Sequence, residues 1–297
     1  VEHEACHLQH PLTNRLMREI LPVLEELSIK PANGKGSRGI LQQLLIRVGV
    51  CTDQLMLVLI TGSGLLPRRD ELVKKLTKQV PELASIYQEI RRGRPGRQKV
   101  ELHKLWGEDR IIDYIGKYQF KISPRSFFQV NTLQTKVLYD QVASYAGLAG
   151  KEIVLDAYCG IGTISLYLSG QAELVYGVES LAEAVADAEG NAALNQVDNV
   201  FFYQGRVEKV IPVLAEKLRN PDIIVVDPPR AGCDSAFLDF CLGVKPDRFI
   251  YVSCNPATLA RDLQYLQAGD LQPVAVQPVD MFPHTYHIES VVLLARK

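Results

Sequence analysis

The stretch that decides the fold is VLDAYCGIGTISL, residues 154–166. It begins with apolar residues, passes through a turn that contains Gly160 and Gly162, and continues as a second apolar-rich stretch. This order predicts a strand, a tight turn and a helix. Glycines in such a turn let the backbone approach a nucleotide-like ligand at the carboxyl end of the strand. The segment therefore predicts a ligand site on an α/β fold.

The chain after residue 125 alternates between two kinds of segment. Further strand-like runs lie at 174–180, 200–205, 222–229, 248–254, 273–280 and 289–297. Helix-like stretches, such as 181–196 and 207–218, separate several of them. Strands that alternate with helices predict βαβ units and a parallel sheet. We expect a doubly wound, Rossmann-like α/β domain over 126–297, with the last two strands forming an antiparallel edge.

The first 125 residues show a different pattern. A helix is predicted within 1–28, strands at 44–50 and 55–62, a helix at 69–80 and a strand at 84–90. This order predicts a smaller α+β domain over residues 1–125, which precedes the α/β domain.

Composition excludes several classes of protein. The 297 residues are 47% hydrophobic and 23% charged, as in ordinary globular proteins. Apolar runs stay far below the ~18 residues that a membrane span needs. The six cysteines contain no C-x-x-C pair, so neither a disulfide framework nor a zinc ribbon is expected. We expect a cytoplasmic, monomeric protein, and the first residue, Val1, indicates a fragment or a processed chain.

Charge is distributed unevenly along the chain. Residues 1–130 hold 21 Lys and Arg against 14 Asp and Glu, a net charge of +7, whereas residues 131–297 hold 12 against 20, a net charge of −8. The densest basic run comprises Arg91, Arg92, Arg94, Arg97 and Lys99. Such a run indicates either a solvated loop or a loop that contacts the phosphates of a nucleic acid.

Two ligands suit the glycine turn, a dinucleotide or S-adenosylmethionine. The dinucleotide fingerprint requires a third glycine, and position 165 is serine instead. Asp156 precedes the turn, where a carboxylate suits a cationic ligand without phosphates. Glu179 ends the next strand, 23 positions after Asp156, and an acidic group there can bind both ribose hydroxyls. The sequence favours S-adenosylmethionine over an NAD-linked oxidoreductase, with a purely structural turn as the remaining alternative.

A second polar group follows the strand IIVV. Asp227 ends this strand, and Pro228 and Pro229 hold the chain extended after it. Enzymes that methylate exocyclic base nitrogens also use D-P-P turns, but they place an aromatic residue next, and Arg230 stands there in this chain. The turn therefore predicts a rigid carboxylate beside the ligand, without establishing amine methylation.

A cysteine ends the next strand. Cys254 follows RFIYVS and precedes Asn-Pro, at the edge of the sheet where the ligand is expected. Glu289 lies just before the last strand. A thiol, a carboxylate and a methyl donor suit methylation at carbon 5 of uracil, because addition of a thiolate to C6 makes C5 nucleophilic.

The motifs FFQVN, LDAYCGIGT, VVDPPRAGC, YVSCNPATLARD and DMFPHTYHIE closely resemble the RNA (uracil-5-)-methyltransferase family, and within it the bacterial enzymes that act on 23S rRNA. The resemblance implies a central RNA-contacting domain followed by a class I methyltransferase domain. It implies RNA as the partner, and DNA is not expected. It implies Cys254 as the nucleophile and Glu289 as the base that removes the C5 proton. Four further residues are implied as contacts of S-adenosylmethionine: Gln129, Tyr158, Glu179 and Asp227. A tRNA target remains the alternative to 23S rRNA.

The same resemblance implies features that this sequence only partly contains. Many members of the family have an N-terminal barrel and a [4Fe–4S] cluster held by four cysteines. Cys6, in EACHLQHP, resembles the fourth of these ligands, and the other three are missing from the sequence. We expect a cluster only in a longer chain, and a truncated RNA-binding remnant with weak activity is a second functional hypothesis.

The remaining chemically active residues have less specific interpretations. Cys159 is expected to pack, and Phe127 and Phe128 are expected to pack rather than to stack on a base. His284 and His287 either adjust Glu289, contact RNA or have structural roles. Arg261 and Asp262 either pair locally or position the thiol.

Overall fold

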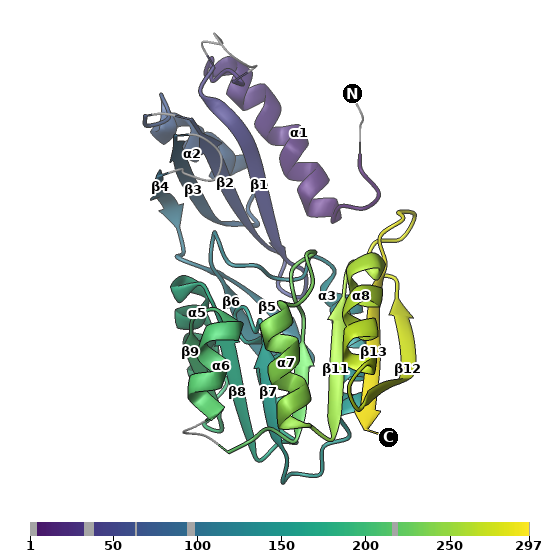
Figure 1. The fold of residues 1–297 in the computed structure, drawn as a ribbon. Coiled ribbons are helices and arrows are strands. Elements are labelled where there is room, and N and C mark those ends of the chain that lie inside the picture. Colours follow the sequence, from purple (N-terminus) through teal and green to yellow (C-terminus); the bar gives the residue numbers. More distant parts are fainter. Residues whose placement is uncertain (1–4, 33–38, 63, 94–98, 216–218, 297) are drawn as a thin grey trace. The chain divides into compact units, whose positions relative to one another are not determined.

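The computed structural model describes residues 5–32, 39–62, 64–93, 99–215 and 219–296 and divides the chain into two compact units (Figure 1). The first unit contains residues 1–114 and 121–125, and the second contains residues 115–120 and 126–297. Among the described residues, no helix is both long and apolar enough to cross a membrane.

The first unit is built on a four-stranded sheet in the order β1-β2-β3-β4. Its strands are β1 (Leu41–Gly49), β2 (Gln54–Thr61), β3 (Leu83–Arg92) and β4 (Lys99–Gly107), and its helices are α1 (Pro11–Glu26) and α2 (Arg69–Gln79). β2 and β3 are parallel, and the other two pairs are antiparallel. Alternate leucines of β2 share a buried core with apolar residues of both helices. This arrangement is the α+β pattern expected from the sequence.

Some element boundaries differ from the sequence prediction. α1 begins at Pro11, because His10 caps it by accepting a hydrogen bond from the backbone N–H of Leu12 through Nδ1. No helix occupies residues 5–10, where one was expected. The sequence analysis also assigned no structure to β4, β5 (Ile111–Ile115) and β6 (Tyr118–Ile122), of which the last two form a two-stranded sheet.

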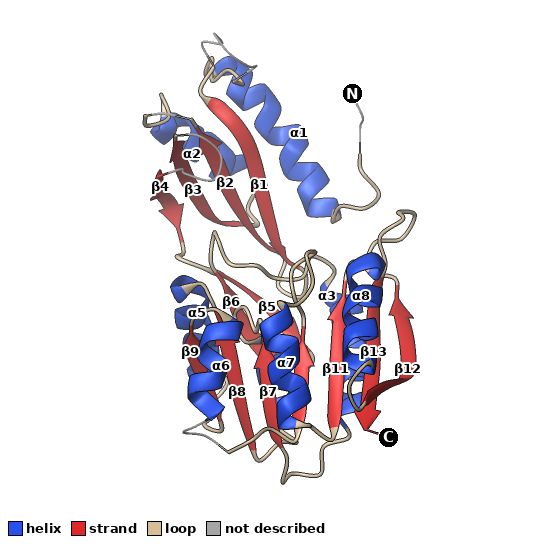
Figure 2. Ribbon diagram, in the orientation of Figure 1, coloured by secondary structure: helices blue, strands red, loops and turns tan. Residues whose placement is uncertain are grey.

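The second unit is built on a seven-stranded sheet in the order β12-β13-β11-β10-β7-β8-β9 (Figure 2). Its strands are β7 (Ile153–Ala157), β8 (Leu174–Glu179), β9 (Val200–Gln204), β10 (Ile223–Val226), β11 (Arg248–Ser253), β12 (Leu271–Val279) and β13 (Glu289–Arg296). Five neighbouring strands of this sheet are parallel: β11, β10, β7, β8 and β9. β13 runs antiparallel to both β11 and β12. The expected doubly wound sheet with an antiparallel edge is confirmed.

Helices cover both faces of this sheet (Figure 1). α6 (Val207–Ala215), α7 (Ser235–Val244) and α8 (Pro256–Gln267) pack on one face, where a buried apolar cluster joins them to β7, β10 and β11. α3 (Thr132–Ala146), α4 (Thr163–Ser169) and α5 (Ala182–Leu194) contact the strands from the other face. Both faces are buried, so the residues available for chemistry lie at the strand ends.

Candidate active site

Most of the residues singled out from the sequence lie at one edge of the seven-stranded sheet, the edge formed by the carboxyl ends of its parallel strands. β7, β10 and β11 are adjacent parallel strands, so the segments that begin at Tyr158, Asp227 and Cys254 leave the sheet at the same edge. β13 runs in the opposite direction, and therefore its first residue, Glu289, lies at this edge as well. The connectivity reverses between β7 and β10, which is where ligands bind in doubly wound sheets.

Strand register brings Cys254 and Glu289 together. β11 and β13 are paired so that Ser253 lies opposite Ser290. Cys254 directly follows Ser253, and Glu289 directly precedes Ser290, so the two residues leave this pair at the same end of adjacent strands. The Glu289 side chain is buried, whereas Cys254 is half-buried and remains accessible.

The charges at this edge influence one another. Burial raises the pKa of the Cys254 thiol, and the nearby carboxylates of Glu289 and Asp227 raise it further, while Arg230 opposes the shift. Burial also raises the pKa of Glu289, again opposed by Arg230. Arg230 is thus close enough to stabilise the anionic form of both groups, a role that the sequence analysis missed.

Two carboxyl groups deeper in the site favour the neutral form. Burial, Glu289 and Asp156 together raise the pKa of Asp227 to about 8. Burial raises the pKa of Asp156 to about 7. Tyr139, from α3, is also buried here, and its hydroxyl shares a 2.8 Å hydrogen bond with Thr163 Oγ1. The site therefore concentrates carboxyl groups that a bound cation would help to ionise.

This property predicts how stability depends on pH. Since the pKa of Asp227 is about 8 in the folded chain and about 4 in an unfolded chain, the folded state binds more protons between these limits. The free energy of unfolding should then fall as pH rises from about 4 to about 8. The Asp227→Asn side chain stays neutral at every pH, so the loss of stability between pH 5 and pH 8 should be smaller in this variant. Each kcal/mol of difference in the free energy of unfolding corresponds to about 2–4 °C in Tm. Thermal melts at pH 5 and pH 8 measure the difference.

The matched control is Asp198→Asn, which changes an exposed carboxylate of the same unit. We expect it to preserve the wild-type dependence of Tm on pH. An Asp227→Asn chain with the same dependence as the wild type would contradict a raised pKa of the half-buried Asp227.

The glycine turn after β7 has room for a ligand. Gly160 has φ +55°, and a Cβ atom added to it would have no atom within 4 Å. Gly162 has φ +80°, and a Cβ atom there would lie 2.7 Å from the ring of Phe202, so only glycine fits. Asp156 accepts a 2.5 Å hydrogen bond from Ser165 through Oδ2, whereas its buried Oδ1 has no hydrogen-bond partner among the described residues. A donor-bearing, cationic ligand would satisfy that oxygen.

Glu179 borders the same turn. Its Oε2 accepts a 3.2 Å hydrogen bond from the N–H of Gly160, and its Oε1 accepts bonds from the Ser180 hydroxyl and the Leu181 N–H. The side chain remains partly exposed. The structure thus holds a carboxylate rigidly at the end of β8, beside the turn.

Two other residues implied as cofactor contacts are Tyr158, directly after β7, and Gln129, in the loop before α3. Tyr158 has a left-handed φ of +68°, a conformation that non-glycine residues adopt mainly at functional or constrained sites. Its ring packs edge-on against Phe237, with 6.0 Å between centroids. Gln129 is partly buried in the loop before α3, two residues before the helix cap Asn131.

Helix α8 holds the D-P-P-R loop by its backbone. The Nδ2 of Asn255 and the hydroxyl of Thr258 both donate to the carbonyl of Arg230, at 2.9 and 3.1 Å. Nη2 of Arg261 donates to the carbonyl of Ala231 at 2.9 Å. Because Asn255 directly follows Cys254, the turn at Cys254 and the Arg230 loop form one hydrogen-bonded unit.

Asp262 completes this attachment from inside the protein. Its buried carboxylate accepts a 2.8 Å hydrogen bond from the N–H of Cys233 and a 2.6 Å bond from the hydroxyl of Tyr251. Arg261 pairs with the same carboxylate. Of the two alternatives left by the sequence, the structure shows the local pair, and positioning of the Cys254 thiol stays a prediction.

Gly232 is essential to this packing. It has φ +81°, and an added Cβ would lie 2.5 Å from Arg261 Nη2 and 2.6 Å from Asp262 Oδ2. We expect Gly232→Ala to lower the free energy of unfolding by about 1–3 kcal/mol, through backbone strain and displacement of the Asp262 carboxylate. Chemical denaturation measures this loss. The control is Gly190→Ala in α5, where no atom lies within 4 Å of the added Cβ. Equal stability of the two variants would contradict the argument.

The predicted basic patch is partly neutralised. Arg91 and Arg92 end β3, and Lys99 begins β4. Arg91 pairs with Glu89 at 2.5 Å, whereas Arg92 and Lys99 both pair with Glu101, at 3.2 and 3.6 Å. The other two members of the patch, Arg94 and Arg97, lie outside the described residues. RNA contact by this hairpin stays a prediction.

Cys6, the predicted ligand of a [4Fe–4S] cluster, has no other metal-binding side chains grouped with it among the described residues. Cys6 is half-buried, and its backbone exchanges hydrogen bonds with the side chain of Asn14. The described part of the chain contains no group of three or more His, Cys, Asp or Glu side chains arranged to hold a metal ion. The residues of this chain thus do not fit a [4Fe–4S] cluster, and no step of the chemistry below uses one.

Other expectations concern packing. Cys159 is buried, as expected. Phe128 packs as expected, 6.0 Å from the ring of Phe120, but Phe127 is 71% exposed, so the prediction that it packs was wrong. The aromatic doublet looks uniform in the sequence, and only the extended backbone before α3 places its two rings in different surroundings.

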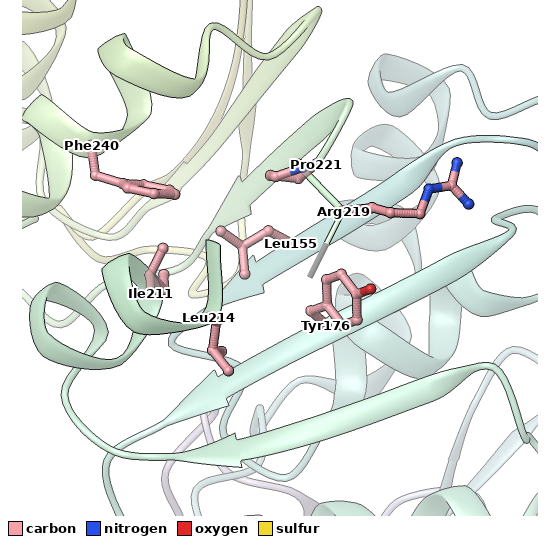
Figure 3. A pocket seen from close by; sticks show the side chains of 7 residues that line it. All are labelled: Leu155, Tyr176, Ile211, Leu214, Arg219, Pro221 and Phe240. Carbon is pink, nitrogen blue, oxygen red and sulfur yellow. The ribbon is translucent and has the colours of Figure 1, made fainter. Parts of the chain in front are cut away.

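A separate apolar pocket lies away from this edge (Figure 3). Leu155 of β7 and Tyr176 of β8 line it from the sheet, and Ile211, Leu214 and Phe240 line it from helices α6 and α7. Arg219 and Pro221, just before β10, complete its lining. The pocket therefore lies on the face of the sheet that α6 and α7 cover, and its lining includes none of the residues proposed for the site.

Comparisons with known proteins agree with this geometry. Two curated relatives, both named uncharacterized RNA methyltransferases, are 45% identical over 298 residues (Oceanobacillus iheyensis) and 48% identical over 301 residues (Halalkalibacterium halodurans). They match 99% and 100% of this chain, which spans 64% and 65% of their lengths.

A solved structure is similar over nearly the whole chain. It is the tRNA (uracil-54, C5)-methyltransferase of Pyrococcus abyssi in complex with S-adenosyl-L-homocysteine, with a TM-score of 0.83 and 29% identity over 99% of this chain and 70% of that one. A family model described as tRNA (Uracil-5-)-methyltransferase matches residues 68–297. These findings confirm the resemblance seen in the motifs: the chain belongs to the tRNA (uracil-5-)-methyltransferase family.

Proposed function

We propose that this chain methylates carbon 5 of a uracil in RNA, with S-adenosylmethionine as the methyl donor. The observation that carries the proposal is the pairing of β11 with β13, since Cys254 follows one strand and Glu289 begins the other at the same end, and the Glu289 carboxylate raises the pKa of the Cys254 thiol. The half-buried thiol and the buried base lie at the strand ends that also carry Asp227 and the glycine turn. This constellation suits covalent catalysis followed by proton removal.

The Cys254 sulfur, as a thiolate, forms a bond to C6 of the uracil, and the electron pair of the C5–C6 double bond moves to the ring as an enolate. Arg230 favours the thiolate by opposing the rise in the thiol's pKa. The enolate makes C5 nucleophilic, and C5 takes up the methyl group as the donor's sulfur–methyl bond breaks, which leaves S-adenosyl-L-homocysteine as the by-product. Glu289 then removes the proton from C5, the double bond re-forms, and the C6–S bond breaks to release Cys254.

S-adenosylmethionine supplies an electrophilic methyl group in this scheme. We assign its binding to the glycine turn of Gly160 and Gly162, to Glu179 at the ribose and to Asp156, whose free Oδ1 suits a cationic donor. Gln129, Tyr158 and Asp227 are proposed as further contacts. The similarity of this chain to the Pyrococcus abyssi structure, which holds S-adenosyl-L-homocysteine, supports this assignment.

The target uracil must leave its stack, because C5, C6 and the ring faces are inaccessible within a helix. We propose 23S rRNA as the substrate on the strength of the motif resemblance, and tRNA as the alternative, because the solved relative acts on tRNA. The test is incubation with methyl-labelled S-adenosylmethionine and, separately, unmodified 23S rRNA and unmodified tRNA. Digestion then identifies the labelled nucleoside.

Label in 5-methyluridine from 23S rRNA is the expected result. The same nucleoside from tRNA alone would keep the chemistry and overturn the substrate. Labelled nucleosides other than 5-methyluridine would overturn the reaction. Binding of RNA and S-adenosylmethionine without any transfer would instead favour the second hypothesis, an RNA-binding remnant with weak activity.

A further inference from the structure

One side chain near the proposed active site has an unusual environment. Tyr286 lies in the loop between β12 and β13 and is 90% exposed, the largest exposure among the described large apolar side chains. It stands three residues before Glu289 in the sequence. Exposed aromatic rings near a nucleic-acid site commonly serve as platforms on which unpaired bases stack.

The base of this loop is fixed to helix α3. Asn131, which caps α3, donates from Nδ2 to the carbonyl of Met281 at 3.1 Å. Gln134 donates from Nε2 to the carbonyl of Asp280 at 3.3 Å. Met281 itself is 1% exposed and anchors the loop in the interior. The first residues of the loop are therefore held in place.

The tip of the loop is also constrained. The hydroxyl of Thr285 donates to the carbonyl of Phe282 at 2.7 Å, and the N–H of Thr285 donates to the same carbonyl at 3.2 Å. The N–H of His287 donates to the Thr285 hydroxyl at 3.2 Å. His284 adopts a left-handed φ of +64°. These bonds form a compact turn directly before Tyr286.

The ring of Tyr286 is supported on one side only. Its centroid lies 4.2 Å from that of the His287 imidazole, at an interplanar angle of 38°. The His287 ring in turn lies 6.4 Å from Phe282, at 72°. One face of Tyr286 therefore rests against an imidazole, and its high exposure leaves the other face open to solvent.

We infer that Tyr286 is a stacking site for an unpaired nucleobase next to the target uracil, and that it sets the position of the RNA strand relative to Glu289. The inference rests on the proposed function, and it names a single-stranded RNA base as the ligand of this loop. Base–aromatic stacking does not depend on base identity, so Tyr286 contributes position and affinity rather than sequence preference.

The test compares RNA binding and methylation in the wild type and three variants of the full chain. One substrate is an unmodified stem–loop RNA fragment that the wild type methylates. The others are copies of this fragment in which one nucleotide flanking the target uracil is abasic, a different one in each copy. We expect Tyr286→Ala to raise the KM for the intact RNA by about 5- to 100-fold, the range for loss of one stacked base. Its KM for S-adenosylmethionine and its kcat should stay near wild-type values.

Two variants serve as controls. Tyr286→Phe keeps the ring and should restore wild-type KM. Phe201→Ala removes another exposed ring of the second unit, from β9 at the far edge of the sheet, and should have no effect. For the wild type, removal of one particular flanking base should weaken RNA binding as much as Tyr286→Ala weakens binding of the intact RNA. For Tyr286→Ala, removal of that same base should weaken RNA binding no further.

The outcomes separate this inference from the proposed function. A wild-type KM in Tyr286→Ala, or equal losses at every abasic position in both proteins, would overturn the stacking site while methylation persists. Equilibrium RNA affinity, measured in a Cys254→Ala background, gives the same comparison without turnover. If no RNA is methylated by the wild type, the proposed function fails, and the affinity measurements still decide the role of Tyr286.

Discussion

Cys254→Ala should abolish the formation of 5-methyluridine, with a loss of at least about a thousandfold in kcat, as expected when a covalent nucleophile is removed. Without the thiol no bond forms at C6, and C5 stays too poor a nucleophile to accept a methyl group. Transfer of label from methyl-labelled S-adenosylmethionine to RNA measures the loss. Cys254→Ser should be almost as inactive, because a hydroxyl is a much weaker nucleophile near neutral pH.

Two controls separate chemistry from folding. Cys241→Ala removes a buried thiol from α7 and should retain the rate of methyl transfer in the fraction that folds. The affinity of Cys254→Ala for S-adenosylmethionine should equal that of the wild type, because Cys254 is not among the proposed cofactor contacts. Wild-type methylation by Cys254→Ala would rule out the covalent mechanism.

Glu289→Gln should have a different effect, because it acts after the covalent bond has formed. The amide cannot remove the C5 proton, and therefore the methylated RNA should remain attached to Cys254. We expect turnover to fall by about 10²- to 10⁴-fold, the usual contribution of a general base. A protein–RNA band that survives denaturation should accumulate, and gel electrophoresis with labelled RNA detects it.

The double variant Cys254→Ala/Glu289→Gln is the control for this band, which should disappear completely. Glu289→Asp retains a carboxylate on a shorter side chain and should recover part of the turnover. Full turnover in Glu289→Gln, without a trapped band, would show that another group takes the proton.

The sequence predicted the fold of the second unit well because the central strands of its sheet are buried on both faces. IIVV of β10 and RFIYVS of β11 are nearly continuous apolar runs, which are typical of parallel sheets. The position of the polar residue after each run then follows from strand direction alone. β4, with the sequence KVELHKLWG and mostly exposed side chains, lacks this signal and was not assigned.

The sequence was enough to select the candidate residues of the site, but not to predict which of them contact one another. Cys254 and Glu289 stand 35 positions apart, and nothing local in either segment specifies that Ser253 pairs with Ser290. The contacts of Asp262 with Cys233 and Tyr251 are hidden for the same reason, since they depend on how α8 packs on the sheet. The opposite environments of Phe127 and Phe128 likewise depend on the path of the chain.

The insertion of β13 between β11 and β12 also has a consequence for the order of folding. β12 is synthesised first, yet its only neighbour in the described sheet is β13, so it cannot join the sheet until β13 has docked. The N-terminal part of a chain generally folds first during synthesis. The carboxylate of Glu289 therefore comes close to Cys254 only when β13 docks on β11. Under the proposed mechanism, a chain folded only as far as β11 has the nucleophile without its base, and competence to complete the reaction depends on the docking of β13.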